Sequence, residues 1–244
     1  MTSPRPIALI TGASSGIGAA IARKLAQEGY CIIAVARRIE RLQAMAAEFP
    51  DGVIVPEGVD LRREADIVAL FERVGASGKS VDVLVNNAGL GRRAPLLSGD
   101  AESWREMLDV NVLALTICTR EAVKQMQANN SGHVINISSM AGHRVLPSST
   151  FYAATKFAVR ALTEGLRQEL RSADSPIRVS AVSPGLVETE FVAQMDSEAQ
   201  AKETYGRFPV LQPEDIANAV WYLLSQPEYV QIHDLLVRPT QQKA

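Results

Sequence analysis

Short runs of apolar and β-branched residues alternate along the chain with longer segments whose apolar residues recur at helical spacing. The short runs predict seven strands, over residues 7–11, 31–36, 53–59, 81–86, 133–138, 178–182 and 232–237. Several runs are almost continuously apolar, which is typical of parallel strands covered on both faces. The intervening segments predict helices over residues 17–28, 39–49, 65–74, 102–129, 152–170 and 213–224.

This alternation of strands and helices predicts right-handed crossovers and hence a doubly wound, seven-stranded parallel sheet of the α/β class. No repeat or long linker interrupts the pattern, so we expect residues 1–244 to form a single cofactor-binding and catalytic domain. Such a sheet binds ligands beyond the carboxyl ends of its strands. Functional residues are therefore expected directly after each strand.

A glycine-rich segment, TGASSGIG at residues 11–18, follows the first predicted strand and opens the first predicted helix. Glycine permits a tight turn and a close approach to a ligand, and the free N–H groups of a helix N-terminus favour a pyrophosphate. The alternative is a plain glycine-rich turn, but the position between strand and helix favours a dinucleotide site. The expected contacts are Gly12, Ser14, Ser15, Gly16, Ile17 and Gly18.

Two arginines, Arg37 and Arg38, follow the second predicted strand. A site for NAD usually carries an acidic residue near this strand end, where it bonds the ribose hydroxyls. Ala36 leaves that place without a carboxylate, and guanidinium groups suit a 2′-phosphate. The alternative is a pair of solvated arginines at a helix start. We expect NADP(H), with Arg37 as the first candidate for the phosphate contact and Arg38 as the second.

Tyr152 and Lys156 stand one helical turn apart in the predicted helix 152–170. A tyrosine has a reference pKa of about 10, and a nearby ammonium lowers it. Such a tyrosine can protonate a carbonyl or deprotonate an alcohol. Alone, this spacing is frequent on exposed helices. Ser139 at a strand end and Asn111 amid apolar neighbours favour a catalytic group.

Five blocks stand in order along the chain: residues 11–18, Asn-Asn-Ala-Gly at 86–89, Asn111, Ser139 with Tyr152 and Lys156, and Ser-Pro-Gly at 183–185. In these blocks the chain resembles the short-chain dehydrogenase/reductase family, over essentially its whole length. The resemblance implies a Rossmann fold and a catalytic tetrad. In that tetrad Tyr152 exchanges the proton, Ser139 hydrogen-bonds the reacting oxygen and Asn111 anchors a water. Lys156 lowers the pKa of Tyr152 and holds the nicotinamide ribose.

The resemblance also implies further cofactor contacts. Asp60, with Leu61 beside it, is expected at the adenine. Besides Tyr152 and Lys156, the other expected contacts are Asn87, Ala88 and Gly89 on the adenosine side, and Pro184, Gly185, Val187 and Thr189 at the nicotinamide.

Two C-terminal segments, residues 211–217 and 233–240, are similar to one branch of this family. That branch contains NADP-dependent serine 3-dehydrogenases, 3-hydroxy acid dehydrogenases and clavulanic acid dehydrogenase. It implies a small alcohol or carbonyl substrate, such as a 3-hydroxy acid, amino alcohol, aldehyde or ketone. The family resemblance implies a homo-oligomer, a tetramer or dimer, paired through the helices at 102–129 and 152–170.

Residues 188–208 lack strand periodicity and predict a lid of one or two short helices over the nicotinamide. Its expected apolar contacts are Phe191, Met195, Tyr205 and Phe208. Any of four arginines around the expected mouth could bind a substrate carboxylate, although each has the alternative of being a solvated surface residue. They are Arg92, Arg93, Arg144 and Arg207.

Composition narrows the function classes further. The chain of 244 residues is 47% hydrophobic and 21% charged, with a net charge of −2, which excludes extensive disorder and argues against a nucleic-acid partner. No apolar run reaches the roughly 18 residues that cross a bilayer, so no membrane partner is expected. Neither the two cysteines nor the three histidines show metal-ligand spacing. We therefore expect no bound metal. The polar first residues resemble no export signal, so we expect a cytoplasmic protein.

The sequence therefore predicts an NADP(H)-dependent oxidoreductase that transfers a hydride between the nicotinamide and a small-molecule alcohol or carbonyl. One alternative is a non-catalytic NADP-binding sensor or scaffold, whose simplest sign would be a lost catalytic residue, whereas all four are present. An epimerase or dehydratase usually carries an additional substrate domain, for which this chain has no room. A methyltransferase would have no use for Tyr152 and Lys156.

Overall fold

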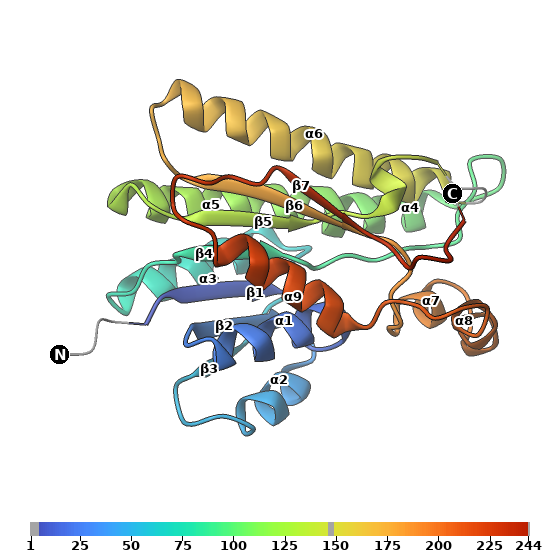
Figure 1. Cartoon of the computed structure of the whole chain (residues 1–244), viewed down its shortest axis with the longest axis horizontal. Helices are drawn as coiled ribbons and strands as arrows, with labels where there is room; N and C mark the ends of the chain where they lie inside the picture. The colour runs from blue at the N-terminus through green and yellow to red at the C-terminus, as the bar shows by residue number, and fades with distance from the viewer. Residues whose placement is uncertain (1–4, 146–148, 244) are drawn as a thin grey trace.

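Seven parallel strands form one sheet in the order β3-β2-β1-β4-β5-β6-β7 (Figure 1). This computed structural model describes residues 5–145 and 149–243. The strands are β1 (Ile7–Thr11), β2 (Cys31–Ala36), β3 (Ile54–Gly58), β4 (Val83–Asn86), β5 (His133–Ile137), β6 (Arg178–Pro184) and β7 (Asp234–Val237). The strand order reverses between β1 and β4, so the loops after these strands open a crevice at the carboxyl edge. The predicted doubly wound sheet is confirmed.

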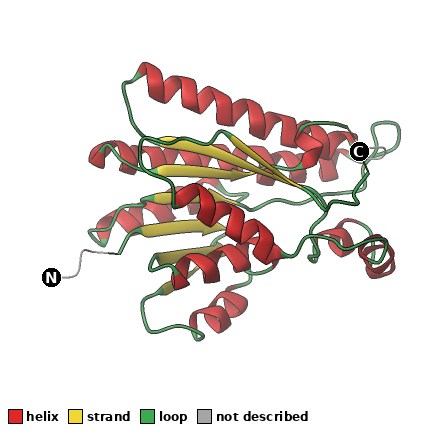
Figure 2. Ribbon diagram, in the orientation of Figure 1, coloured by secondary structure: helices red, strands yellow, loops and turns green. Residues whose placement is uncertain are grey.

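Helices cover both faces of the sheet (Figure 2). One face packs against α1 (Gly16–Gln27), α2 (Ile39–Ala46) and α9 (Pro213–Leu224). The other packs against α3 (Glu64–Ala76), α5 (Leu115–Asn129) and α6 (Thr150–Ser172). Burial from both sides explains the almost continuously apolar strands. Among the described residues, none of the helices is both long and apolar enough to span a bilayer.

The predicted helix 102–129 is interrupted in the structure. It consists of α4 (Ala101–Leu108), a π-helical turn η1 (Asp109–Ala114) and α5. A single 3₁₀ turn, η2 (Met140–Gly142), follows β5. Two short helices, α7 (Phe191–Met195) and α8 (Glu198–Tyr205), lie beyond the carboxyl ends of the strands (Figure 1). They form most of the segment 188–208, in which one or two short helices are predicted.

Candidate active site

The turn between β1 and α1 packs directly on the segment that follows β4. Gly12 and Gly16 have φ angles of +69° and +53°, a region that favours glycine. A Cβ on Gly18 would lie 2.4 Å from Asn87 Nδ2, so a larger residue would displace that segment. Asn87 Nδ2 also donates to Gly12 O at 3.3 Å. Ser15 begins α1 without a side-chain cap, which leaves N–H groups at the helix start available to a ligand.

The segment after β4 connects this turn to the buried lysine of α6. Thr11 Oγ1 accepts hydrogen bonds from the backbone N–H groups of Asn87 and Ala88, both at 3.0 Å. At the next residue, Gly89, a Cβ would lie 3.5 Å from Lys156 Nζ. The expected cofactor contacts therefore form one continuous wall from the glycine-rich turn to α6.

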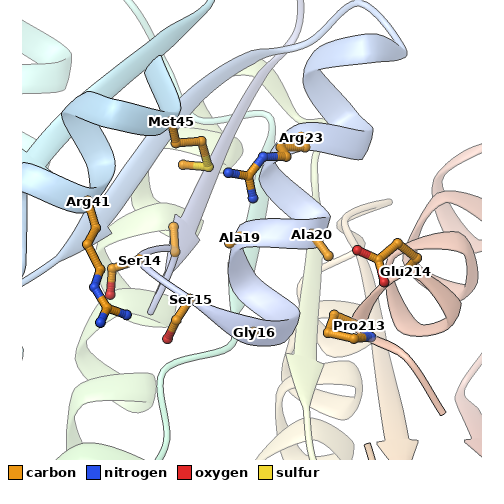
Figure 3. Close-up of a pocket in the computed structure, with 11 residues that line it drawn as sticks. Ser14, Ser15, Gly16, Ala19, Ala20, Arg23, Arg41, Met45, Pro213 and Glu214 are labelled. Atoms are coloured by element: carbon orange, nitrogen blue, oxygen red, sulfur yellow. The ribbon is translucent and has the colours of Figure 1, made fainter. Parts of the chain in front are cut away.

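A pocket of about 240 Å³ opens beside the glycine-rich turn. Ser14 and Ser15 line it, and Arg41 reaches toward them from α2 (Figure 3). Arg38 lies at the same turn, because its guanidinium donates to Ser14 Oγ at 3.2 Å and to Ser15 Oγ at 2.7 Å. The sequence analysis did not single out Arg41. The sequence feature that could have identified Arg41 is its position three residues after Arg38, near the start of α2.

Asp60 and Leu61 follow β3 at the same edge of the sheet. Asp60 Oδ2 accepts a hydrogen bond from Arg62 Nη2 at 2.6 Å, and Arg62 lowers the pKa of Asp60 to about 2. Arg37 is exposed and adds a smaller electrostatic lowering. The structure thus associates Arg37 with Asp60, and it is Arg38, the second candidate for the phosphate contact, that lies at the turn.

Tyr152 and Lys156 lie on α6 beside the end of β5. Lys156 is only 5% exposed, and its Nζ donates to Ile137 O at 3.0 Å and lies 5.8 Å from the centroid of the Tyr152 ring. Burial raises the pKa of Tyr152 to about 12, although the hydrogen bond with Ser139 opposes this. Burial also lowers the pKa of Lys156 to about 8. The expectation that Lys156 lowers the pKa of Tyr152 is not met in this arrangement, because burial is the larger effect.

The two serines after β5 have different partners. Ser139 begins the η2 turn, and its Oγ accepts a hydrogen bond from Ala141 N at 3.0 Å. Ser138 is buried, and its Oγ donates to Lys156 O at 3.4 Å. Ser139 is also the serine that forms a side-chain hydrogen bond with Tyr152.

Asn111 lies in the π-helical turn η1 and is 1% exposed. Its Oδ1 accepts from Leu90 N at 2.8 Å, and its Nδ2 donates to Leu90 O at 2.8 Å and to Thr155 Oγ1 at 3.0 Å. Single π-helical turns are frequent at functional sites. The side chain of Asn111 thus fastens the loop after β4 to α6.

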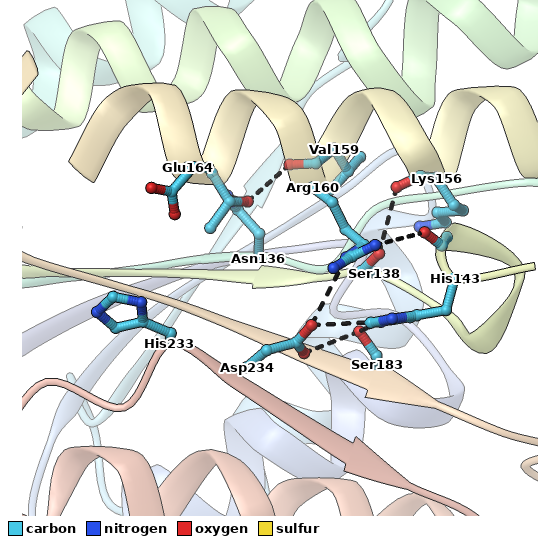
Figure 4. Close-up of polar contacts among 12 residues, drawn as sticks. Asn136, Ser138, His143, Lys156, Val159, Arg160, Glu164, Ser183, His233 and Asp234 are labelled. Atoms are coloured by element: carbon cyan, nitrogen blue, oxygen red, sulfur yellow. Dashed lines mark hydrogen bonds and ion pairs between the residues drawn. The ribbon is translucent and has the colours of Figure 1, made fainter. Parts of the chain in front are cut away.

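A second polar cluster lies beside the loop after β5 (Figure 4). His143 Nε2 is 3.0 Å from Ser183 Oγ and 3.2 Å from Asp234 Oδ2, and Arg160 donates to Gly142 O at 3.1 Å. Burial is the main cause of the lowered pKa of His143. The cluster ties β6, β7 and α6 to that loop. Over residues 5–145 and 149–243, no group of three or more His, Cys, Asp or Glu side chains is placed to hold a metal ion.

One apolar side chain of α7, that of Phe191, covers Tyr152, and a second, that of Met195, lies beside Gly91. The rings of Phe191 and Tyr152 have centroids 5.5 Å apart. A Cβ on Gly91 would lie 2.8 Å from Phe191 Cζ and 3.0 Å from Met195 Sδ. The loop after β4 and α7 therefore meet beside Tyr152.

The segment after β6 is held from two directions. Tyr205 Oη donates to Thr189 O at 3.0 Å, so its hydroxyl holds the backbone of this segment. Gln242 Oε1 accepts from Leu186 N at 3.0 Å, and a Cβ on Gly185 would lie 2.3 Å from it. Gln242 was missed by the sequence analysis, since a contact between distant parts of the chain leaves no local pattern.

Three of the four arginines near the expected mouth form ion pairs. The pairs are Arg92 with Glu106 at 2.8 Å, Arg93 with Asp196 at 2.7 Å and Arg207 with Glu203 at 2.6 Å. Arg144 differs, because its Nε is buried and has no hydrogen-bond partner among the described residues. Among these four arginines, Arg144 is thus the one with a buried N–H donor that no described residue accepts from.

Comparisons with known proteins agree with this geometry. The profile of a family described as short chain dehydrogenase matches residues 6–200. Human dehydrogenase/reductase SDR family member 11 is 49% identical, over 97% of this chain and 95% of its own length. Farnesol dehydrogenase of Aedes aegypti is 41% identical, over 97% of each chain. The closed form of serine dehydrogenase complexed with NADP⁺ superimposes with a TM-score of 0.93 at 36% identity, covering 98% of this chain and 96% of that one.

Proposed function

Because the chain belongs to the short-chain dehydrogenase family, we propose that it is an NADP(H)-dependent oxidoreductase acting on a small alcohol or carbonyl compound. The observation that carries the proposal is the meeting of Tyr152, Ser139 and Lys156 at the carboxyl edge of the sheet, beside the glycine-rich turn. Nothing in the comparisons supports the alternative of a non-catalytic sensor or scaffold.

The residues at the turn fit a dinucleotide that carries a 2′-phosphate. A Cβ on Gly12 would fall 2.9 Å from Ala88 Cα, so the turn stays bare of side chains where a pyrophosphate approaches the start of α1. Arg38 offers a guanidinium together with the hydroxyls of Ser14 and Ser15. Solved relatives support NADP(H), since both the serine dehydrogenase and an alcohol dehydrogenase from Thermococcus sibiricus are complexed with NADP or 5-hydroxy-NADP.

In the proposed mechanism the nicotinamide supplies or accepts the hydride. Tyr152 gives its proton to the carbonyl oxygen in reduction and takes it back from the alcohol in oxidation. Ser139 donates a hydrogen bond to the same oxygen as charge develops on it. Lys156 holds the ribose, and its ammonium favours the phenolate when it turns toward Tyr152. Asn111 keeps the loop after β4 and α6 in register, and we propose that it also anchors a water.

The proposal is tested by the substrate-dependent change in NADPH absorbance. Tyr152→Phe is expected to lower kcat at least about a hundredfold, because the proton donor is lost, while NADPH binding measured by fluorescence stays near the wild-type value. Tyr222→Phe is the matched control, since Tyr222 is 51% exposed. Retained turnover in Tyr152→Phe would refute the assigned role.

The substrate has two candidate classes. Arg144, whose buried Nε has no hydrogen-bond partner among residues 5–145 and 149–243, supports a small hydroxy acid, because guanidinium groups bind carboxylates. A second class, an apolar alcohol, is favoured by Leu96 and Leu97, which are 59% and 100% exposed in the loop after β4. The farnesol dehydrogenase relative points the same way.

A panel of hydroxy acids, amino alcohols, aldehydes, ketones and long-chain alcohols, tested with NADP(H) and NAD(H), separates these classes. Arg144→Met is expected to raise KM for a carboxylate substrate about tenfold, whereas KM for an apolar alcohol would not change. Arg92→Met, Arg93→Met and Arg207→Met complete the series. Unchanged KM in all four variants would rule out a carboxylate contact through these arginines.

We also propose a cytoplasmic homo-oligomer, a dimer or tetramer, in which α5 and α6 pair with a second copy. Apolar side chains on the outer surface near these helices support pairing, since Leu113, Phe157 and Leu162 are 52%, 41% and 36% exposed. Light scattering coupled to size-exclusion chromatography tests the assembly. A monomer at micromolar concentration would refute it.

A further inference from the structure

Glu190 connects the segment after β6 to the start of α2. Its Oε2 accepts a hydrogen bond from Arg38 Nη1 at 3.0 Å, and its Oε1 accepts one from Arg41 Nη1 at 2.7 Å. These hydrogen bonds from Arg41 and Arg38 lower the pKa of Glu190, so the carboxylate is ionised at neutral pH. Glu190 thus bridges two guanidinium groups. One of them, that of Arg41, lines the pocket in Figure 3.

The same guanidinium of Arg38 reaches the glycine-rich turn. It donates to Ser14 Oγ and Ser15 Oγ while it is paired with Glu190. Two cationic groups and two hydroxyls at a helix N-terminus make a site suited to an anion. In this structure the anion at that site is a carboxylate of the chain itself.

We propose that Glu190 occupies the arginine site for the 2′-phosphate before NADP(H) binds, and that the phosphate takes its place on Arg38. This inference rests on the proposed NADP(H) function. A phosphate dianion and a carboxylate repel one another at contact distance, so Arg38 does not serve both at once without a penalty. The exchange is feasible because Arg38, Arg41 and Glu190 side chains are 40%, 48% and 42% exposed, and ion pairs this exposed are weak.

Replacement of Glu190 by the phosphate on Arg38 would change the packing around Tyr152. Glu190 stands between Thr189, whose carbonyl binds Tyr205 of α8, and Phe191, whose ring covers Tyr152. Release of Glu190 from Arg38 removes one of its two ion pairs and leaves the pair with Arg41 in place. A cofactor with a 2′-phosphate therefore removes one contact that fastens the cover over Tyr152, whereas a cofactor without one leaves both contacts.

Two adenosine nucleotides that differ only by the 2′-phosphate isolate its effect without any turnover. Calorimetry compares adenosine 2′,5′-bisphosphate with adenosine 5′-monophosphate in the wild type, Glu190→Gln and Glu188→Gln. Glu188 is the matched control, because its Oε2 accepts from Gln212 Nε2 at 3.0 Å. Glu190→Gln is expected to bind the 2′,5′-bisphosphate about three- to tenfold more tightly, as the competing charge is lost. Its affinity for the 5′-monophosphate, and both affinities of Glu188→Gln, should equal the wild-type values.

The outcomes separate the inference from the proposed function. If the wild type does not prefer the 2′,5′-bisphosphate, the proposed NADP(H) specificity is wrong. If the wild type prefers it but Glu190→Gln binds it equally or more weakly, the exchange alone is refuted. Hydrogen exchange of residues 189–195 in the wild type gives a second readout that needs no variant. The 2′,5′-bisphosphate should speed this exchange and the 5′-monophosphate should not, and equal exchange with both also refutes the inference.

Discussion

The aromatic ring of Phe191 packs against that of Tyr152, with centroids 5.5 Å apart and planes inclined by 55°. This contact helps to bury the phenol, and burial is the main reason why the pKa of Tyr152 is raised to about 12. The Phe191 ring therefore contributes to the burial that raises the pKa of Tyr152.

Phe191→Ala is expected to admit water to Tyr152 and to lower its pKa by about one unit. Alcohol oxidation needs the phenolate, so the rise of its rate with pH should move to lower pH by the same amount. Phe191→Leu, which keeps an apolar cover, should restore most of the wild-type profile. A pH–rate profile that does not move in Phe191→Ala would show that other groups control the titration.

Asn111→Ala is expected to destabilise the fold by about 2–4 kcal/mol, because the half-buried N–H and C=O of Leu90 and the buried Thr155 Oγ1 each lose a hydrogen bond. Asn129→Ala is the control, since it removes one exposed hydrogen bond to Ser80 and should cost less than about 1 kcal/mol. Urea unfolding followed by circular dichroism measures both. Equal losses in the two variants would contradict a clamping role for Asn111.

Arg38→Gln is expected to weaken NADPH binding about ten- to a hundredfold, through the loss of a charge-assisted contact to the 2′-phosphate. NADH binding should change little. Arg37→Gln, at the adjacent exposed position, should weaken NADPH binding less than about threefold. Fluorescence titration with both nucleotides measures the two losses of affinity. A larger loss in Arg37→Gln would show that Arg37 is the main contact of the 2′-phosphate, as expected from the sequence.

His133 makes stability depend on pH on the acid side. It is 2% exposed, and burial lowers its pKa from 6.5 to about 3. Between these two values the unfolded chain binds a proton that the folded chain does not, so stability is full above pH 6.5 and is lost as pH falls toward 3. The expected slope is about 1.4 kcal/mol per pH unit. His133→Gln, which does not titrate, should show a correspondingly flatter curve in denaturant unfolding at each pH, whereas parallel curves would contradict the assignment.

The sheet could be predicted from the sequence because strands buried on both faces are almost continuously apolar. β1 and β2 begin and end as predicted, since both consist of apolar residues covered by helices on each side. The break in the helix 102–129 could not be predicted in the same way. Asn111 is held there by Leu90 and Thr155, and neither partner is near it in the sequence.

The sequence identified most of the residues that lie at the site, but it did not show which of them contact one another. Adjacent arginines look equivalent in the sequence, but only the fold separates Arg38 at the turn from Arg37 near Asp60. The pKa of Tyr152 was expected to follow the nearby charge of Lys156. The structure makes burial the larger effect, and burial depends on α7, which packs from a distant part of the chain.

The contact between Gln242 and Leu186 decides where a purification tag can be attached. A peptide fused after residue 244 would start two residues from a side chain that fastens the backbone beside the expected nicotinamide position. The beginning of β1 lies at the opposite edge of the sheet (Figure 1). An affinity handle for the binding experiments therefore belongs at the N-terminal end, where it would leave the nucleotide crevice undisturbed.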